Sequence, residues 1–179
     1  MLRVAKSLTA HTADLDDGTR SAIRGLLDSS FTTFTDDAFE NVLGGLHALA
    51  FEGNELVGHA SVVQRRLLYD GRALRAGYVE GVAVREDRRR QGHGQALMSA
   101  LERAIHSAYD LGALGASADG ARLYTARGWL RWQGPSSAMT PDGIRRTTSS
   151  DGAIYVLPVS IELDVSRELV CDWRDGFLW

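Results

Sequence analysis

The sequence is poor in cysteine and proline, with one and three residues of these types among 179. The single cysteine, Cys171, excludes an internal disulfide and a zinc site built from cysteines. No apolar run approaches the length of about 20 residues that a membrane-spanning helix needs. The first residues also lack the apolar core and small-residue cleavage site of a secretory signal. We therefore expect a cytoplasmic protein that does not associate with a membrane.

The chain also has little excess of either positive or negative charge, since its formal net charge is −3. A nucleic-acid-binding protein would normally carry a strong basic excess, so we expect no nucleic-acid partner. The balance leaves room for a local acidic patch that faces a cationic ligand. The five histidines include no pair four residues apart and no H-E-x-x-H pattern, so no metal site is predicted.

Hydrophobic residues make up 44% of the chain, enough for a sizeable core in one domain over residues 1–179. The patterns predict strands at 2–8, 46–51, 56–69, 73–84, 111–116, 129–132 and 153–161, and helices at about 19–30, 35–43, 95–108 and 119–126. Residues 133–152 are rich in Gly, Pro, Ser and Thr and are expected to form a long loop over a ligand. This order of elements predicts an α+β domain.

The most informative stretch runs from residue 78 to residue 108 and indicates a strand, a basic glycine-rich turn and a helix. The strand is apolar at Val79, Val82 and Val84. The helix carries one apolar stripe with the spacing of a buried face, which comprises Leu97, Ala100, Leu101, Ala104, Ile105 and Ala108.

The turn between them favours an anion site. Gly92 and Gly94 stand where the backbone must turn sharply and lie close to a ligand. The unpaired N–H groups and the positive dipole end of the following helix can hold a phosphate, and the arginine run at 88–90 adds positive charge. The alternative is an ordinary tight turn with solvated arginines.

The pattern Arg89-x-x-Gly92-x-Gly94 after the strand Gly81–Val84 resembles the acyl-CoA pyrophosphate loop of the GNAT superfamily of N-acetyltransferases. Further segments resemble the mycobacterial aminoglycoside 2′-N-acetyltransferases, and they are LGGLHAL at 43–49, QRRL at 64–67, GYVEGVAV at 77–84, RLY at 122–124, RGW at 127–129 and CDWR at 171–174. The resemblance implies a GNAT fold, with a mixed, mostly antiparallel, splayed sheet flanked by helices. It also implies acetyl-CoA as co-substrate and a homodimer.

The resemblance implies roles for individual residues as well. In GNAT enzymes the splayed strand offers backbone N–H groups to the thioester carbonyl and the pantetheine arm, which here belong to Val82, Ala83 and Val84. The phosphates would lie on Arg89, Arg90, Gln91, Gly92, His93 and Gly94, although His93 could equally be a solvated side chain.

Two side chains are candidates for proton transfer. Glu80 is expected to be the general base and lies two residues before Val82, on the same face of a regular strand. The alternative for Glu80 is a structural salt bridge to Arg75 or Arg66. Tyr124 is expected to protonate the departing thiolate, and its alternative is core packing.

An aminoglycoside is a polycation, so its pocket should offer carboxylates and carbonyl groups. The positions expected to bind this substrate are Asp36, Asp37, Glu80, Gly81, Gly115, Ser150, Asp151 and the C-terminal carboxylate of Trp179, with Glu40 as a further candidate. The ending Phe177-Leu178-Trp179 suggests a tail that packs down. The chain departs from the resembled family at Thr33, Ala38, Gly115, Ser150 and Phe177. From these departures we expect a weaker or differently tuned aminoglycoside site, with acetyl transfer intact.

The leading hypothesis is therefore an enzyme that acetylates the 2′-amine of aminoglycoside antibiotics by direct transfer from acetyl-CoA in a ternary complex, and so confers resistance. A second hypothesis is a GNAT enzyme that acts on another cellular amine. A third is a non-catalytic protein that binds acyl-CoA.

Overall fold

A computed structural model describes residues 6–179, and the chain divides into two compact units. The first comprises Met1–Val63 and Val79–Arg103, and the second comprises Gln64–Tyr78 and Ala104–Trp179. Strands β3 (Glu55–Tyr69) and β4 (Arg72–Val84) and helix α3 (His93–Ala108) contribute residues to both units. The expectation of one catalytic domain over 1–179 stays a prediction.

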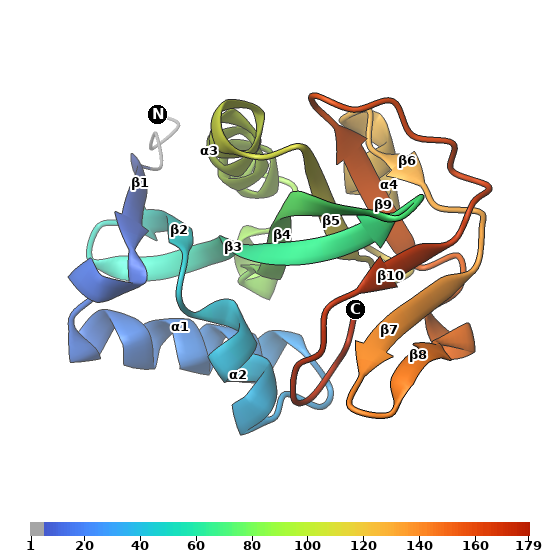
Figure 1. Ribbon diagram of the computed structural model, residues 1–179. Coiled ribbons are helices and arrows are strands. Elements are labelled where there is room, and N and C mark those ends of the chain that lie inside the picture. Colours follow the sequence, from blue (N-terminus) through green and yellow to red (C-terminus); the bar gives the residue numbers. More distant parts are fainter. Residues whose placement is uncertain (1–5) are drawn as a thin grey trace. The chain divides into compact units, whose positions relative to one another are not determined.

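The first unit is built on antiparallel strands. Strand β1 (Lys6–His11) pairs with β2 (Leu46–Glu52), which pairs with β3 through a tight turn at Gly53 and Asn54. The start of the first expected strand, at 2–5, lies outside the described residues. Helices α1 (Asp17–Ser30) and α2 (Asp36–Val42) are drawn in blue beside these strands in Figure 1. Their apolar faces share a core cluster, which comprises Leu15, Ile23, Leu26, Leu27, Val42, Leu49 and Ala83.

Short polar side chains begin both helices. The Asp16 carboxylate accepts a hydrogen bond from the Thr19 N–H at 2.6 Å, and the Thr35 hydroxyl accepts one from the Ala38 N–H at 3.2 Å. Helix α1 therefore begins two residues before the expected start at Thr19.

Helix α3 begins at His93, two residues before the expected start at Gln95. The expected stripe is largely confirmed, because Leu97, Ala100, Leu101 and Ile105 are buried, but Ala108 is exposed. Helix α3 and strand β3 are in close contact in the first unit, since a Cβ atom on Gly58 of β3 would lie 3.1 Å from Leu97 Cδ1 of α3.

The second unit is a sheet with the strand order β6-β9-β5-β4-β3-β10-β7-β8, which includes the parts of β3 and β4 that belong to it. Its further elements are β5 (Leu111–Gly115), α4 (Ala121–Ala126), β6 (Leu130–Arg131), β7 (Ser136–Thr140), β8 (Gly143–Arg146), β9 (Ile154–Pro158) and β10 (Leu169–Cys171). The β4–β5 and β10–β7 pairs are parallel, and the other registered pairs are antiparallel. The prediction of a mixed, mostly antiparallel α+β fold is confirmed. None of the helices within residues 6–179 is long and apolar enough to cross a membrane.

The prediction of a long loop over residues 133–152 was wrong. This segment contains the β7–β8 hairpin and a short 3-10 turn at Thr148–Ser150, and β7 pairs with β10, which the sequence did not predict. All four β8 residues are exposed. The strand therefore has no alternation of buried apolar and exposed polar side chains, which is the pattern that identifies a strand in a sequence. Pairing with neighbouring strands stabilises this hairpin, and that pairing is not visible in the local sequence.

The buried side chain of Arg65 holds the C-terminal tail in the second unit. Its guanidinium is 4% exposed and donates to the Asp172 carboxylate at 2.7 Å and to the Leu178 carbonyl at 2.6 Å. It also lies over the Tyr78 ring, 4.6 Å from the ring centre. The expectation of a packed tail is confirmed, and Cys171 is a buried side chain.

Arg65→Met should destabilise the protein, because it removes donors from two acceptors near the tail. We expect the free energy of unfolding in urea to fall by about 2 kcal/mol or more. Limited proteolysis should also cut the tail near Leu178 sooner. Arg66→Met, at the exposed next position of β3, is the matched control and should change stability by less than about 0.5 kcal/mol. Equal effects of the two variants would contradict the anchoring role of Arg65.

Candidate functional site

The glycine-rich turn leads directly into the first turn of α3. Arg90 and Gly92 have positive φ angles of 62° and 87°, and the Gly92 carbonyl accepts from the Ala96 N–H at 3.0 Å. Gly92 therefore stands immediately before the helix. The N–H groups of the helix's first turn have no acceptor within the helix and carry the positive end of its dipole. This geometry suits a phosphate group.

Glu52, at the end of β2, supports both sides of this turn. Its carboxylate accepts from Arg88 Nε at 2.8 Å and lies 3.3 Å from His93 Nε2. The hydrogen bond from Arg88 holds the pKa of Glu52 below its usual value. His93 is buried, so the alternative of a solvated histidine does not apply. Sequence reasoning missed Glu52, because it precedes the turn by some 40 residues.

The arginines between residues 85 and 90 divide into two groups. Arg85 and Arg88 form ion pairs with the carboxylates of Glu55, Asp87 and Glu52. Arg89, Arg90 and Gln91 are exposed. The structure therefore brings the expected phosphate ligands together around the turn, with Arg89 and Arg90 as its exposed guanidinium groups.

The second half of β4 is not a regular strand. Gly81 has φ of +56°, outside the extended region, so the strict alternation of faces stops there. The argument that Glu80 and Val82 share a face depended on that alternation and does not hold. Glu80 and Val82 are half-buried, and Ala83 is buried. The registered pairing of β4 with β5 ends at Tyr78.

The acidic turn of α2 contains Asp36 and Asp37, which are both exposed. Asp36 pairs with Arg24 at 2.8 Å, and Arg24 also pairs with Asp28. Part of the charge of Asp36 is therefore compensated within the first unit. Among the departures from the resembled family, Thr33 is exposed and Ala38 is buried.

In the second unit, Tyr124 of α4 is 6% exposed and packs near Trp129 and Tyr155, with ring centres 6.1 Å away in both cases. Burial raises the pKa of Tyr124 to about 12, so the phenol keeps its proton at neutral pH. A proton donor needs that state, although the same surroundings also provide core packing.

The C-terminal carboxylate lies against Gly115 in the second unit. A Cβ atom on Gly115 would be 3.1 Å from the carboxyl carbon of Trp179 and 3.3 Å from its oxygen. The Trp179 indole donates to the Thr147 hydroxyl at 2.8 Å, which holds the last residue in place. Two expected substrate positions, Gly115 and Trp179, are therefore adjacent. Phe177 is exposed.

Asp151 has a structural role that the sequence did not indicate. One carboxylate oxygen accepts from the Ser136 N–H at 2.9 Å and from its hydroxyl at 2.8 Å, and the other accepts from Arg146 at 2.7 Å. The hydrogen bond from the Ser136 backbone is the main cause that lowers its pKa. Asp151 thus ties the β7–β8 hairpin to the segment before β9. The adjacent Ser150 is half-buried and its carbonyl accepts from the Ala153 N–H.

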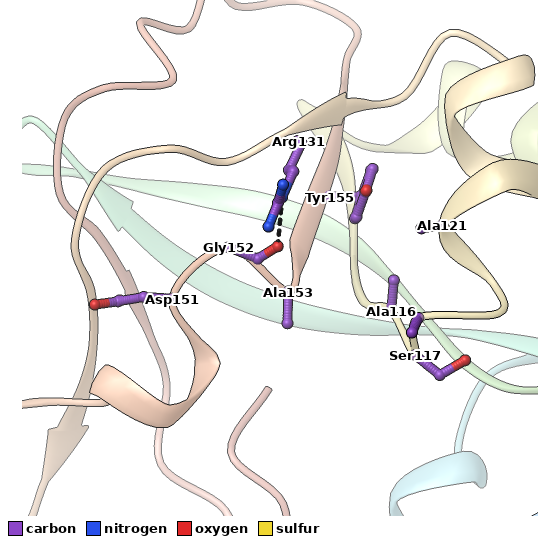
Figure 2. Close-up of a pocket in the computed structure, with 9 residues that line it drawn as sticks. Ala116, Ser117, Ala121, Arg131, Asp151, Gly152, Ala153 and Tyr155 are labelled. Carbon is purple, nitrogen blue, oxygen red and sulfur yellow. Dashed lines mark hydrogen bonds between the residues drawn. The ribbon is translucent and has the colours of Figure 1, made fainter.

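A pocket of about 380 Å³ lies beside Asp151 in the second unit (Figure 2). It is lined by the segment between β5 and α4, the start of α4, one residue each of β6 and β9, and the segment before β9. These residues are Ala116, Ser117, Ala118, Ala121, Arg131, Asp151, Gly152, Ala153 and Tyr155. Arg131 donates to the Gly152 carbonyl at 2.6 Å, the dashed line in Figure 2. Within residues 6–179 no cluster of His, Cys, Asp or Glu could hold a metal ion.

Comparison with known proteins gives concordant matches. The model of the acetyltransferase (GNAT) family matches residues 15–129. An aminoglycoside 2′-N-acetyltransferase of Mycolicibacterium fortuitum is 49% identical over 174 residues, which cover 94% of this chain and 89% of that protein.

Solved structures resemble the chain at lower identity and bear on the fold alone. The GNAT family N-acetyltransferase YhbS of Escherichia coli, solved in complex with CoA, has a TM-score of 0.66 and 16% identity over 96% of this chain and 92% of its own. Escherichia coli ElaA has a TM-score of 0.57 and 21% identity over 86% of this chain and 99% of its own.

Gly92→Glu should abolish CoA binding, because it places a negative charge and a strained positive-φ residue at the phosphate turn. Gly71→Glu is the matched control, since Gly71 also has a positive φ of 75° and a Cβ atom there would meet nothing within 4 Å. Calorimetric titration with CoA should show no binding to the first variant and wild-type affinity in the second. Unchanged binding by Gly92→Glu would rule out the phosphate site.

Proposed function

Because the chain belongs to the acetyltransferase (GNAT) family, we propose that it transfers the acetyl group of acetyl-CoA to the 2′-amine of aminoglycosides. The observation that carries this proposal is the 49% identity, along nearly the whole chain, to an aminoglycoside 2′-N-acetyltransferase. The geometry of the turn before α3 supports a co-substrate that carries phosphate groups. Resistance to the acetylated drug would follow from such an activity.

The proposed chemistry is direct transfer. Glu80 takes a proton from the substrate ammonium, directly or through a water molecule, and the neutral amine attacks the thioester carbonyl. Backbone N–H groups at Val82, Ala83 and Val84 stabilise the negative charge that develops on the carbonyl oxygen and hold the pantetheine arm. The carbon–sulfur bond then breaks, and Tyr124 gives its proton to the departing thiolate. The nitrogen of the new amide loses its second proton, which restores the Tyr124 phenol through solvent. The products are an amide and CoA.

The acceptor would be anchored by carboxylates. The proposed anchors are the Trp179 carboxylate, which lies beside Gly115, and the carboxylates of Glu80 and the exposed Asp37. Gly81, Ser150 and Asp151 are the other proposed contacts. Asp36 and Asp151 are already paired with arginines, so they would attract a cation less strongly than unpaired carboxylates.

That pairing also favours a second candidate, acetylation of a cellular amine with fewer positive charges than an aminoglycoside. Two of the expected acidic ligands are compensated, by Arg24 and by Arg146. A substrate with one or two amines would need only the remaining carboxylates. The cytoplasmic location stays a prediction from the sequence, and the homodimer stays a prediction of the resemblance.

The acceptor can be tested by release of CoA thiol from acetyl-CoA. We expect turnover with an aminoglycoside that carries a 2′-amine and none with its counterpart that carries a 2′-hydroxyl, because the proposed reaction acetylates the 2′ nitrogen and leaves the other amines unchanged. Monoamines serve as the comparison for the second candidate. Faster turnover of a monoamine than of the 2′-amino drug would replace the first proposal with the second.

The catalytic roles can be tested by two conservative substitutions. Glu80→Gln and Tyr124→Phe should each lower kcat by about 100-fold or more, because each removes one proton-transfer group. Both variants should bind acetyl-CoA with wild-type affinity, since neither residue is placed on the phosphates. A variant that keeps full kcat would lose its assigned role. Full activity in both would favour the view that the two residues are structural.

A further inference from the structure

Two histidines that the proposed reaction does not use are buried in the first unit, His47 on β2 and His59 on β3. Their facing nitrogens, His47 Nδ1 and His59 Nε2, are 2.9 Å apart. At one end of the pair, His59 Nδ1 lies 2.7 Å from the Gly81 carbonyl oxygen. At the other end, His47 Nε2 lies 2.7 Å from the Thr12 hydroxyl. A continuous chain of hydrogen bonds therefore runs through β2 and β3 and ends on β4, next to Glu80.

The carbonyl end fixes the direction of the protons in this chain. A carbonyl oxygen can only accept, so His59 carries its proton on Nδ1, and its Nε2 is the acceptor. His47 then donates from Nδ1 and accepts on Nε2 from the Thr12 hydroxyl. The Thr12 oxygen accepts in turn from the Gly44 N–H at 2.8 Å. Both rings are neutral in this arrangement and both carry the Nδ1 proton.

The surroundings keep both rings neutral. Burial lowers the pKa of His47 to about 4, and the positive charge of Arg20 acts in the same direction. Burial lowers the pKa of His59 to about 3. The chain also cannot pass a proton to Glu80, because it ends on a carbonyl oxygen. Its effect must therefore act through the backbone.

The Gly81 carbonyl belongs to the same planar peptide unit as the Val82 N–H. No peptide among the described residues is cis, so these two groups point in opposite directions. A donor fixed on the carbonyl oxygen therefore fixes the direction of the Val82 N–H. It also draws electron density toward the oxygen, which strengthens the N–H as a donor.

Gly81 is a position where such a restraint matters. Its φ of +56° lies in a region that glycine adopts easily, but glycine also leaves it easily. A Cβ atom there would lie 3.0 Å from Val42 Cγ2 and 3.3 Å from the His59 ring, so a larger residue cannot supply the rigidity. The hydrogen bond and the packing of His59 supply it instead.

We propose that His59, oriented by His47, is a positioning residue that fixes and polarises the peptide between Gly81 and Val82, so that the Val82 N–H is aimed at the thioester carbonyl of acetyl-CoA. The inference rests on the proposed function, because that function assigns the Val82 N–H to the carbonyl.

A matched pair of substitutions at His59 separates this role from space filling. The side-chain amide of His59→Asn reaches the position of Nδ1 and can donate to the Gly81 oxygen. The amide of His59→Gln reaches the position of Nε2, keeps the contact with His47 and leaves the carbonyl without its donor. We expect kcat to fall about tenfold or more in His59→Gln and less than about threefold in His59→Asn. The KM for acetyl-CoA should stay within about twofold in both variants.

The kinetics are measured with the amine that the wild-type protein acetylates fastest, so the comparison does not depend on an aminoglycoside. Equal losses of kcat in the two variants would mean that the imidazole only fills space, and that result would overturn the proposal. Full kcat in His59→Gln would overturn it as well. A matching rise in the KM for acetyl-CoA would point to a general loss of structure and would also contradict the proposal.

Nitrogen-15 NMR of the wild-type protein tests the same geometry without substrate or variants. Both His47 and His59 should be neutral, with the proton on Nδ1, from pH 8 down to pH 5, because their pKa values lie near 4 and 3. A ring protonated on Nε2, or one that titrates near its ordinary pKa of about 6.5, would overturn the inference. The outcome of this NMR measurement does not depend on the identity of the acceptor.

Discussion

A hydrogen bond from His59 to the Gly81 carbonyl lies at the point where β4 leaves the extended conformation, next to the residues proposed for catalysis. Gly81 takes the strand out of its extended conformation with φ of +56°, and the buried ring holds the peptide there at 2.7 Å. Glu80 precedes this peptide and Val82 follows it. Glu80, the proposed base, and the Val82 N–H, the proposed donor to the thioester carbonyl, therefore lie on either side of a contact made by His59 of the neighbouring strand β3. The burial of His59 makes that contact independent of ordinary pH.

The phosphate turn depends on a similar support. Glu52 contacts Arg88 before the turn and His93 at the start of α3, so a single carboxylate holds both ends. It pairs with one arginine of the run, and Arg89 and Arg90, which the proposed phosphate site includes, are exposed. In the second unit, the C-terminal tail is held in a similar way. Arg65 donates to the Leu178 carbonyl, Thr147 accepts from the Trp179 indole, and the terminal carboxylate lies against Gly115. Each candidate group is thus positioned by a residue distant in sequence.

The sequence predicted those parts of the fold that have strong local patterns. The apolar stripe of α3, the strands β2, β3 and β4 and the turn at Gly92 all follow from the spacing of apolar residues and from turn residues. The β7–β8 hairpin and β10 escaped prediction, because short exposed strands form only through their partners. Among site residues, Asp151 was predicted to bind the substrate, and the structure shows that Ser136 and Arg146 already bind its carboxylate. His47 and His59 were recognised only as residues that bind no metal, since the Gly81 contact requires three strands to be in register.

The most direct test of the proposed activity is to locate the acetyl group on the product. An aminoglycoside with several amines, one of them at the 2′ position, is incubated with acetyl-CoA and the protein, and the product is analysed by two-dimensional NMR. We predict one new amide, at the 2′ nitrogen, together with one equivalent of free CoA. An acetyl group on a different amine, or unmodified drug in the presence of bound acetyl-CoA, would contradict the proposed function.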